Sequence, residues 1–169
     1  MTATTRTLVL NGAEVELKIK RIAWEVFERH ANESEVILVG IANSGYWLAK
    51  QVHSQLERIS DLKITLVEME LNKKEPLSHD VRLSADLSSF GGKCVVLIDD
   101  VLNSGKVLIY GIRYLLTQPL KQLTTAVLVD RNHKTFPVKA DVKGLSLSTS
   151  LSEHVEVVIN DTSAEVFLS

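Results

Sequence analysis

The chain has 169 residues, of which 45% are hydrophobic and 24% are charged, and its formal net charge is −2. Such a composition excludes a disordered chain and a surface basic enough overall to attract nucleic acid without sequence preference. No window approaches the roughly 20 apolar residues that a membrane-spanning helix needs. We therefore expect a single domain over residues 1–169, with one sizeable core, in the cytoplasm and with no membrane partner.

Helix and strand patterns alternate in the first half of the chain. Asn11 is followed three positions later by Glu14, which is a capping pattern, and the apolar residues beyond recur at helical spacing. Short runs of consecutive branched apolar residues are typical of strands buried on both faces. These patterns predict a helix over 11–30, a strand over 35–42, a helix over 46–59 and a strand over 62–70.

A segment without sustained periodicity, residues 72–92, separates the two halves, and we interpret it as a long loop or hairpin of the kind that often forms a lid. Strands joined by helices imply right-handed crossovers and a parallel sheet covered on both sides. The expected fold class is α/β, a doubly wound, mainly parallel sheet with a small rim or hood of short strands. The second half predicts a strand over 94–98, a helix over 106–117, a strand over 124–130 and short strands within 138–150 and 154–160.

Two adjacent carboxylates, Asp99 and Asp100, follow the buried strand over 94–98. Neighbouring carboxylates repel each other, so a site that keeps both ionised needs a cation, donor groups or water. Residues 103–105 can form a tight turn whose N–H groups wrap an oxyanion at the start of the next helix, and Lys106 adds positive charge. The alternative is that the aspartates only end a strand and cap a helix. The combination of this acidic pair with an oxyanion-binding loop indicates a binding site for a sugar phosphate.

The stretch VVLIDDVLNSGKVL, residues 95–108, is similar to the phosphoribosyl pyrophosphate signature of type I phosphoribosyltransferases. That signature is an apolar strand, two acidic residues, two apolar residues, one variable residue and a Thr/Ser-Gly phosphate loop. Residues 38–52 and 126–150 resemble one branch, the pyrimidine-operon attenuator proteins with uracil phosphoribosyltransferase activity. The resemblance covers most of residues 8–157.

The resemblance implies a role for each matching residue. The acidic pair would hold the ribose hydroxyls of phosphoribosyl pyrophosphate, and Mg²⁺ would be held through this ligand and by the same carboxylates. One loop would cradle the 5′-phosphate and another would meet the pyrophosphate. The residues concerned are Asp99 and Asp100 (catalytic and ribose-binding), Asn103, Ser104, Gly105, Lys106 and Val107 (phosphate loop), and Ala42, Asn43, Ser44 and Gly45 (pyrophosphate loop).

Two departures from the family pattern concern the anionic groups of the ligand. Val107 stands where the family usually has a Thr whose hydroxyl meets the 5′-phosphate, which removes one donor. Ser44 stands where the attenuator branch commonly has an Arg, so a bidentate clamp on the pyrophosphate is missing. The run LNKKEP, residues 71–76, also stands where the branch has an Arg-Asp-containing run, and Lys73 or Lys74 is a candidate substitute there. We expect weaker or differently arranged ligand binding.

Another set of residues concerns the base and RNA. Asn103 stands where purine-salvage members have an Asp general base, which argues against that chemistry and is compatible with a pyrimidine. Val142 replaces the aromatic residue that usually stacks on the base. A basic segment in the same region contributes to RNA binding in the attenuator branch; a solvated charged rim is the alternative. The expected base-side or RNA contacts are Arg131, His133, Lys134 and Val142.

The sequence thus leads us to expect an enzyme that transfers ribose 5-phosphate from phosphoribosyl pyrophosphate to a nucleobase, most simply a pyrimidine such as uracil, and releases pyrophosphate. The alternative is a catalytically weak or inactive nucleotide-sensing regulator of pyrimidine metabolism, able to bind RNA. A third interpretation is an enzyme of the same fold that acts on another base or on a phosphorylated ribose product. By family likeness we expect a homodimer or a higher homo-oligomer.

Overall fold

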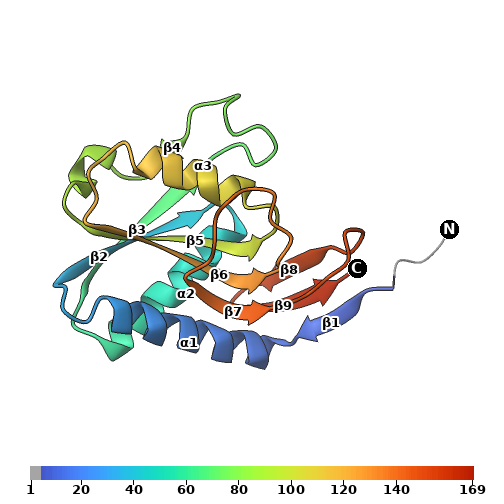
Figure 1. The fold of residues 1–169 in the computed structure, drawn as a ribbon. Coiled ribbons are helices and arrows are strands. Elements are labelled where there is room, and N and C mark those ends of the chain that lie inside the picture. Colours follow the sequence, from blue (N-terminus) through green and yellow to red (C-terminus); the bar gives the residue numbers. More distant parts are fainter. Residues whose placement is uncertain (1–4) are drawn as a thin grey trace.

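The computed structural model describes residues 5–169, so the first four residues of the predicted domain lie outside it. A six-stranded sheet with the order β4-β3-β2-β5-β6-β7 forms the centre of the protein (Figure 1). Neighbouring strands from β3 to β7 run parallel, and β4 pairs antiparallel with β3 at one edge. Its strands are β2 (Glu35–Ile41), β3 (Lys63–Glu70), β4 (Arg82–Leu83), β5 (Cys94–Leu102), β6 (Gln122–Asp130) and β7 (Val142–Ser146).

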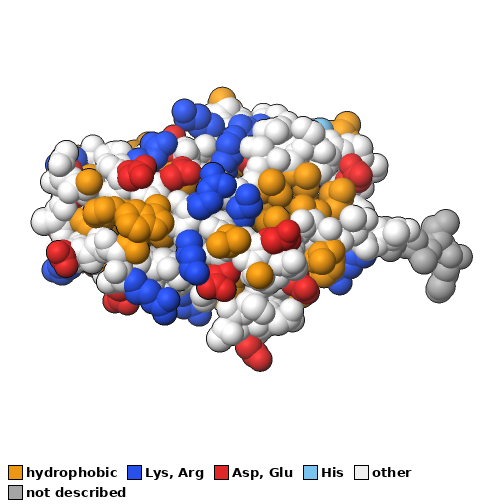
Figure 2. Space-filling model, turned by 90° about the horizontal axis from the view of Figure 1, so that it is seen from below, with side chains coloured by type: hydrophobic (Ala, Val, Ile, Leu, Met, Phe, Trp, Pro, Cys, Tyr) orange, Lys and Arg blue, Asp and Glu red, His pale blue; other side chains and the backbone are white. Residues whose placement is uncertain are grey.

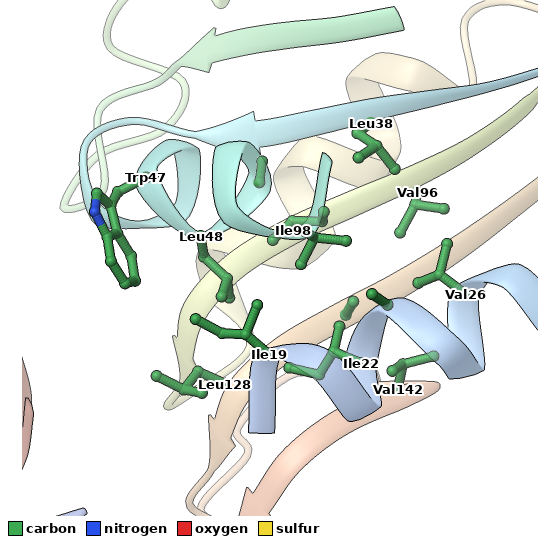
Figure 3. Packing of buried hydrophobic residues seen from close by; sticks show 14 of the residues in the cluster. Ile19, Ile22, Val26, Leu38, Trp47, Leu48, Val96, Ile98, Leu128 and Val142 are labelled. Carbon is green, nitrogen blue, oxygen red and sulfur yellow. The ribbon is translucent and has the colours of Figure 1, made fainter. Parts of the chain in front are cut away.

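Helices cover both faces of this sheet, as the predicted doubly wound α/β class requires. Two of them, α1 (Gly12–Arg29) and α2 (Ser44–Ile59), pack on one face, where Ile22 and Val26 of α1 lie near Val142 of β7 (Figure 3). The third helix, α3 (Lys106–Leu115), packs on the opposite face through Leu108 and Leu115. The predicted capping box is confirmed, since Asn11 and Glu14 each accept a hydrogen bond from the other's backbone N–H.

A second, three-stranded antiparallel sheet has the order β1-β9-β8 and lies beside α1 (Figure 1). It is the small rim of short strands that the sequence predicts, although the sequence patterns indicate only β8 (Val155–Asn160). They do not indicate the other two strands, β1 (Thr7–Leu10) and the central strand β9 (Ser163–Leu168). No helix among residues 5–169 is long and apolar enough to cross a membrane.

One boundary differs from the prediction. Strand β5 does not end at Ile98 but continues to Leu102, so the two aspartates lie within the strand rather than after it. Pairing with the neighbouring strand β6 up to Leu102 overrides the weak local signal of the two aspartates.

The segment 72–92, predicted as a long loop or hairpin, contains a hairpin, because its short strand β4 pairs antiparallel with β3. A 3-10 turn, Leu87–Phe90, follows β4, and the side chain of Phe90 is buried in the core on the face of the sheet that α3 covers.

Parallel strands bring their carboxyl ends to the same edge of the sheet, and this edge is where ligands collect in such folds. The register places Asp99 of β5 level with Val127 of β6, and Leu102 level with Asp130. The loop after β2 leads directly into α2, and Ala42 in that loop donates its backbone N–H to the carbonyl of Met69 on β3 (2.9 Å). The candidate site therefore forms from loops that follow three adjacent strands.

Candidate phosphoribosyl site

The two aspartates of β5 differ in their surroundings. Asp99 is buried, with 3% of its surface exposed, whereas Asp100 is half-buried. The backbone N–H of Asp100 donates to Oδ1 of Asp99 (2.9 Å), and the N–H of Val101 donates to Oδ1 of Asp100 (2.8 Å). Each carboxylate is thus held by the backbone N–H of the residue that follows it. The two acidic groups have fixed orientations without any ligand.

Asp99 packs against the start of helix α2, which the sequence patterns do not indicate. A Cβ atom at Gly45 would lie 2.8 Å from Oδ1 of Asp99 and 2.9 Å from its Cα, so only glycine allows this approach. Burial raises the pKa of the Asp99 carboxyl well above its ordinary value, and the charge of Asp100 raises it further, while Lys73 lowers it. The Nζ of Lys73 lies 3.9 Å from Oδ1 of Asp99.

Ser44 links the pyrophosphate loop to the acidic pair. Its hydroxyl donates to Oδ2 of Asp100 (2.7 Å), so the predicted residues 42–45 and the aspartates do come together at one point. A hydrogen bond to a charged acceptor is stronger than one between neutral groups, and this one fixes the outer oxygen of Asp100. The residue that replaces the family's Arg therefore contacts a carboxylate of the protein.

The predicted tight turn is present at the start of α3. Gly105 has φ = 86°, a conformation that favours glycine, and the backbone N–H of Lys106 donates to Oγ of Ser104 (3.2 Å). A cavity of about 90 Å³ lies over this turn. Its walls include Lys73, the two aspartates and the whole loop from Asn103 to Leu108. The turn and the acidic pair thus share one small cavity.

A distant segment supports the phosphate loop from outside. The backbone N–H groups of Thr135 and Phe136 both donate to the carbonyl of Ser104 (2.9 and 3.1 Å). Val138 lies so close that a Cβ atom at Gly105 would be 2.4 Å from its Cγ1. Sequence reasoning misses these contacts, because nothing in the local pattern of residues 135–138 indicates which loop they pack on.

Lys106 and the segment after β3 meet above the cavity. The Nζ of Lys106 donates to the backbone carbonyl of Lys74 (3.0 Å), so this cation holds the segment rather than pointing freely at the phosphate loop. A larger cavity of about 650 Å³ lies within residues 70–82, but none of the acidic pair or the phosphate loop lines it. We place the candidate site at the smaller cavity, because the carboxylates and the glycine turn are there.

The structure does not support the predicted exposure of Arg131. The sequence predicts that it contacts a base or RNA, but only 7% of its surface is exposed. Its Nη1 donates to Oδ1 of Asn103 (3.0 Å), and its Nε and Nη2 donate to Oγ1 of Thr149 (3.1 and 3.0 Å). The guanidinium is therefore used inside the protein, where it connects the phosphate loop to the segment before β8.

The other predicted base-side or RNA residues lie in three different environments. Val142 is fully buried in the core beneath α1, so its prediction as a base contact is wrong; as the first residue of β7 its side chain faces the helix. His133 is half-buried and its Nε2 contacts the carbonyl of Thr149. Lys134 alone is exposed, and its Nζ lies 4.0 Å from Oδ2 of Asp130.

Comparison with known proteins shows to which family this chain belongs. Residues 6–162 match the phosphoribosyl transferase domain. The match covers nearly the whole chain and includes the acidic pair, the glycine turn and the loop before α2. The chain therefore belongs to the phosphoribosyltransferase family.

Relatives of similar length narrow the likeness to one branch. The chain is 32% identical over 170 residues to a protein of Listeria welshimeri named bifunctional protein PyrR, with 92% of this chain and 91% of that protein covered. It is 29% identical over 156 residues to the protein of the same name from Streptococcus thermophilus, with 90% of each covered. The resemblance to the attenuator branch, which the sequence motifs indicate, is thereby confirmed.

Solved structures agree on the fold. The hypoxanthine phosphoribosyltransferase of Trypanosoma cruzi superposes with a TM-score of 0.74 over 95% of each chain, at 16% sequence identity. A hypoxanthine-guanine phosphoribosyltransferase from Bacillus anthracis gives a TM-score of 0.72 over 88% of this chain and 86% of that chain, at 15% identity. At such identities the likeness concerns the fold alone, and it confirms the predicted α/β class.

Replacing Gly45 by Ala is expected to destabilise the protein by about 1–3 kcal/mol, because the new methyl group would overlap with Asp99. The measurement is urea denaturation followed by circular dichroism. Gly91→Ala is the matched control, since the nearest atom to its Cβ is 3.9 Å away on Pro119. Equal stability of the two variants would contradict the close packing of Asp99 on α2.

The raised pKa of Asp99 predicts how stability depends on pH. A carboxyl whose pKa is higher in the folded state than in the unfolded state destabilises the fold once the pH exceeds its unfolded value of about 3.9. Asp99→Asn should therefore be more stable than the parent protein at pH 8, and the difference should shrink as the pH falls toward 4. Denaturation curves at several pH values measure this, and a difference that does not vary with pH would refute it.

Proposed function

We propose that the protein binds phosphoribosyl pyrophosphate and transfers its ribose 5-phosphate to a nucleobase, most simply a pyrimidine such as uracil. One observation carries the proposal: two oriented carboxylates and a glycine turn at a helix start line the same small cavity. Carboxylates accept hydrogen bonds from the vicinal hydroxyls of a ribose, and backbone N–H groups at a helix start favour a phosphate. A sugar phosphate carries both vicinal hydroxyls and a phosphate, so a single ligand would satisfy both parts of the cavity wall.

Each part of the site then has a role. Asp99 and Asp100 accept hydrogen bonds from the ribose hydroxyls, and the N–H groups of residues 104–107 hold the 5′-phosphate. The loop over 42–45 faces the pyrophosphate. In the reaction the bond between C1 and the pyrophosphate oxygen breaks, and its electron pair leaves with the pyrophosphate. A ring nitrogen of the base forms the new bond to C1 and gives up its proton to the departing pyrophosphate or to water. The protein contributes by positioning the partners and by stabilising the departing charge.

The donor set fits Mg²⁺ only in part. Asp99 and Asp100 offer the oxygen ligands that Mg²⁺ prefers. However, no group of three or more His, Cys, Asp or Glu side chains that could hold a metal ion occurs within residues 5–169. We therefore propose that these two carboxylates hold Mg²⁺ together with oxygens of the ligand and water. When bound, the ion neutralises charge on the leaving pyrophosphate.

A cation beside the cavity can replace the charge of the Arg that the pyrophosphate loop lacks. Lys73 lines the cavity and lies near Asp99, so it can supply positive charge on the side of the pyrophosphate. Lys106 reaches Lys74 instead, and Val107 provides only its backbone N–H to the phosphate. This arrangement supports ligand binding with fewer charged contacts than the family pattern has.

The direct test combines turnover with one substitution. Purified protein with Mg²⁺ and labelled phosphoribosyl pyrophosphate should release pyrophosphate when one member of a panel of bases is added. Asp100→Asn should weaken phosphoribosyl pyrophosphate binding about tenfold or more in calorimetry, since a charged acceptor for a ribose hydroxyl is removed. Asp61→Asn, an exposed aspartate between α2 and β3, is the matched control.

Two results would count against the proposal. No pyrophosphate release with any base would overturn the transfer reaction. Unchanged affinity of Asp100→Asn for phosphoribosyl pyrophosphate would overturn the ribose contact.

A second candidate function is RNA binding by a regulator. The basic and aromatic side chains on one face of the molecule favour it. On the face that carries α1, basic side chains gather across the middle of the surface (Figure 2). Arg21 of α1 is exposed, Arg29 donates to the carbonyl of Asp141 (3.2 Å), and the Nζ of Lys139 lies 3.9 Å from Oδ1 of the same aspartate. Trp24, three residues after Arg21 on α1, is 49% exposed. Cations for phosphates beside an exposed aromatic ring suit single-stranded RNA.

The RNA candidate has its own test, a double substitution of Arg21→Ala and Lys139→Ala. The affinity for a pyrimidine-gene leader RNA should fall, and the slope of log affinity against log salt should decrease by about one for each phosphate that the protein no longer neutralises. The control pair is Lys63→Ala with Arg113→Ala, at the start of β3 and on α3 across the sheet. An equal fall in affinity for both pairs, or no fall for either, would count against this face as the RNA site.

A further inference from the structure

A cavity of about 320 Å³ lies between helices α1 and α2 and the turn that joins β8 to β9. None of the described residues that line it also lines the cavity over the phosphate loop. Its volume lies within the range of small-molecule sites, about 300–1,000 Å³. The proposed function gives this cavity no role.

Trp47 brings an unpaired hydrogen-bond donor to the wall of this cavity. Only 9% of its surface is exposed, and its Nε1–H has no acceptor within residues 5–169. An indole N–H can only donate, and a buried donor without an acceptor costs stability. Figure 3 shows Trp47 at the edge of the core cluster, with its nitrogen on the side of the ring away from the other labelled residues. A ligand oxygen at this end of the cavity would satisfy the donor.

Arg58 brings a positive charge to the same cavity from the last turn of α2. No ion pair of Arg58 is found in the part of the chain that the structure describes. Glu16 of α1 also lines the cavity, but its carboxylate is paired with Lys20 (3.1 Å). A guanidinium binds a carboxylate through two parallel hydrogen bonds. The charge that the cavity offers to a ligand is therefore positive.

The wall between these two groups is polar on one side and apolar on the other. Gln51, Ser54 and Gln55 line the cavity from α2, at the spacing of one helix face. Val15 and Ile19 line it from α1, and both side chains are buried. A ligand with a hydrocarbon middle can therefore lie against α1 while its polar groups meet α2.

We propose that this cavity is a second ligand site, which binds an extended organic acid with its carboxylate on Arg58 and an uncharged carbonyl oxygen on the Nε1–H of Trp47. The Cα atoms of these two residues are roughly 16 Å apart along α2, so the ligand must be long. Both side chains have donors and no acceptor, which selects oxygen acceptors at both ends. One guanidinium matches the single charge of a carboxylate, whereas a phosphate carries nearly two. The inference does not depend on the proposed function.

Two substitutions each remove one of the two contacts. Trp47→Phe keeps an aromatic ring and removes the N–H, and Arg58→Gln removes the charge at an exposed position. Lys50→Gln is the matched control for charge, because Lys50 is exposed on α2 and does not line the cavity. Trp24→Phe is the control for the loss of a tryptophan, and it leaves Trp47 as the only one in the chain.

The experiment measures dissociation constants by calorimetry for 9-oxodecanoate, for decanoate, which lacks the far carbonyl, and for the short keto acid levulinate. In Trp24→Phe, the fluorescence of Trp47 reports binding at the same time. The parent protein should bind 9-oxodecanoate about tenfold more tightly than either of the other acids. Arg58→Gln should weaken its binding about tenfold, and Lys50→Gln should not. Trp47→Phe should bring the ratio of the affinities for 9-oxodecanoate and decanoate close to one.

Three results would overturn the inference. They are no binding of 9-oxodecanoate by the parent protein, equal weakening by Arg58→Gln and Lys50→Gln, and an unchanged ratio in Trp47→Phe. Thermal unfolding checks that each variant is folded, and Arg58→Gln keeps the test decisive if Trp47→Phe is not.

Ribose 5-phosphate separates this site from the phosphoribosyl site. Saturating ribose 5-phosphate should leave the affinity for 9-oxodecanoate unchanged, because the two cavities are lined by different residues. Competition between the two ligands would place the acid in the phosphoribosyl cavity and overturn the inference. A protein that binds 9-oxodecanoate but not ribose 5-phosphate would support this site and contradict the proposed function alone.

Discussion

The burial of the Asp99 carboxylate against helix α2 is the constraint on which the rest of the site depends. A buried carboxyl beside a second carboxyl is costly, and it persists only where neighbouring groups compensate. Gly45 leaves room for it, the N–H of Asp100 donates to it, and Lys73 faces it. Ser44, one residue before the glycine, holds Asp100. The start of α2 and the middle of β5 therefore form one unit.

That unit explains why the three strand-end loops behave as a single site. The loop after β2 is fixed by the aspartates of β5, and the loop after β5 is fixed by residues that follow β6. Carboxylates that are already oriented lose little freedom when a ligand binds, which favours affinity. The stability that the protein loses by burying Asp99 is thus lost at the site where we propose that phosphoribosyl pyrophosphate binds.

The sequence predicts the elements with strong patterns and fails where contacts are long-range. Branched apolar runs indicate β2, β5 and β6, and the pair Asn11 and Glu14 indicates the start of α1, because these signals are local. The sequence places Arg131 at a ligand surface because a cation in a polar loop normally faces water, and only the fold shows that residues 149–153 cover it. The likeness to a family motif indicates the neighbourhood of Val142 but not the face of β7 on which its side chain lies.

The support of the Ser104 carbonyl by Thr135 and Phe136 has a consequence for the order of folding. The glycine turn precedes α3 and β6 in the chain, but the residues that brace it come only after both. Closing such a non-local contact costs entropy that local contacts do not, so it tends to form late. A nascent chain that ends within β6 can already pair its central strands, yet it has no finished phosphate loop. We therefore expect the chain to bind an anion at this loop only after its last third has been synthesised.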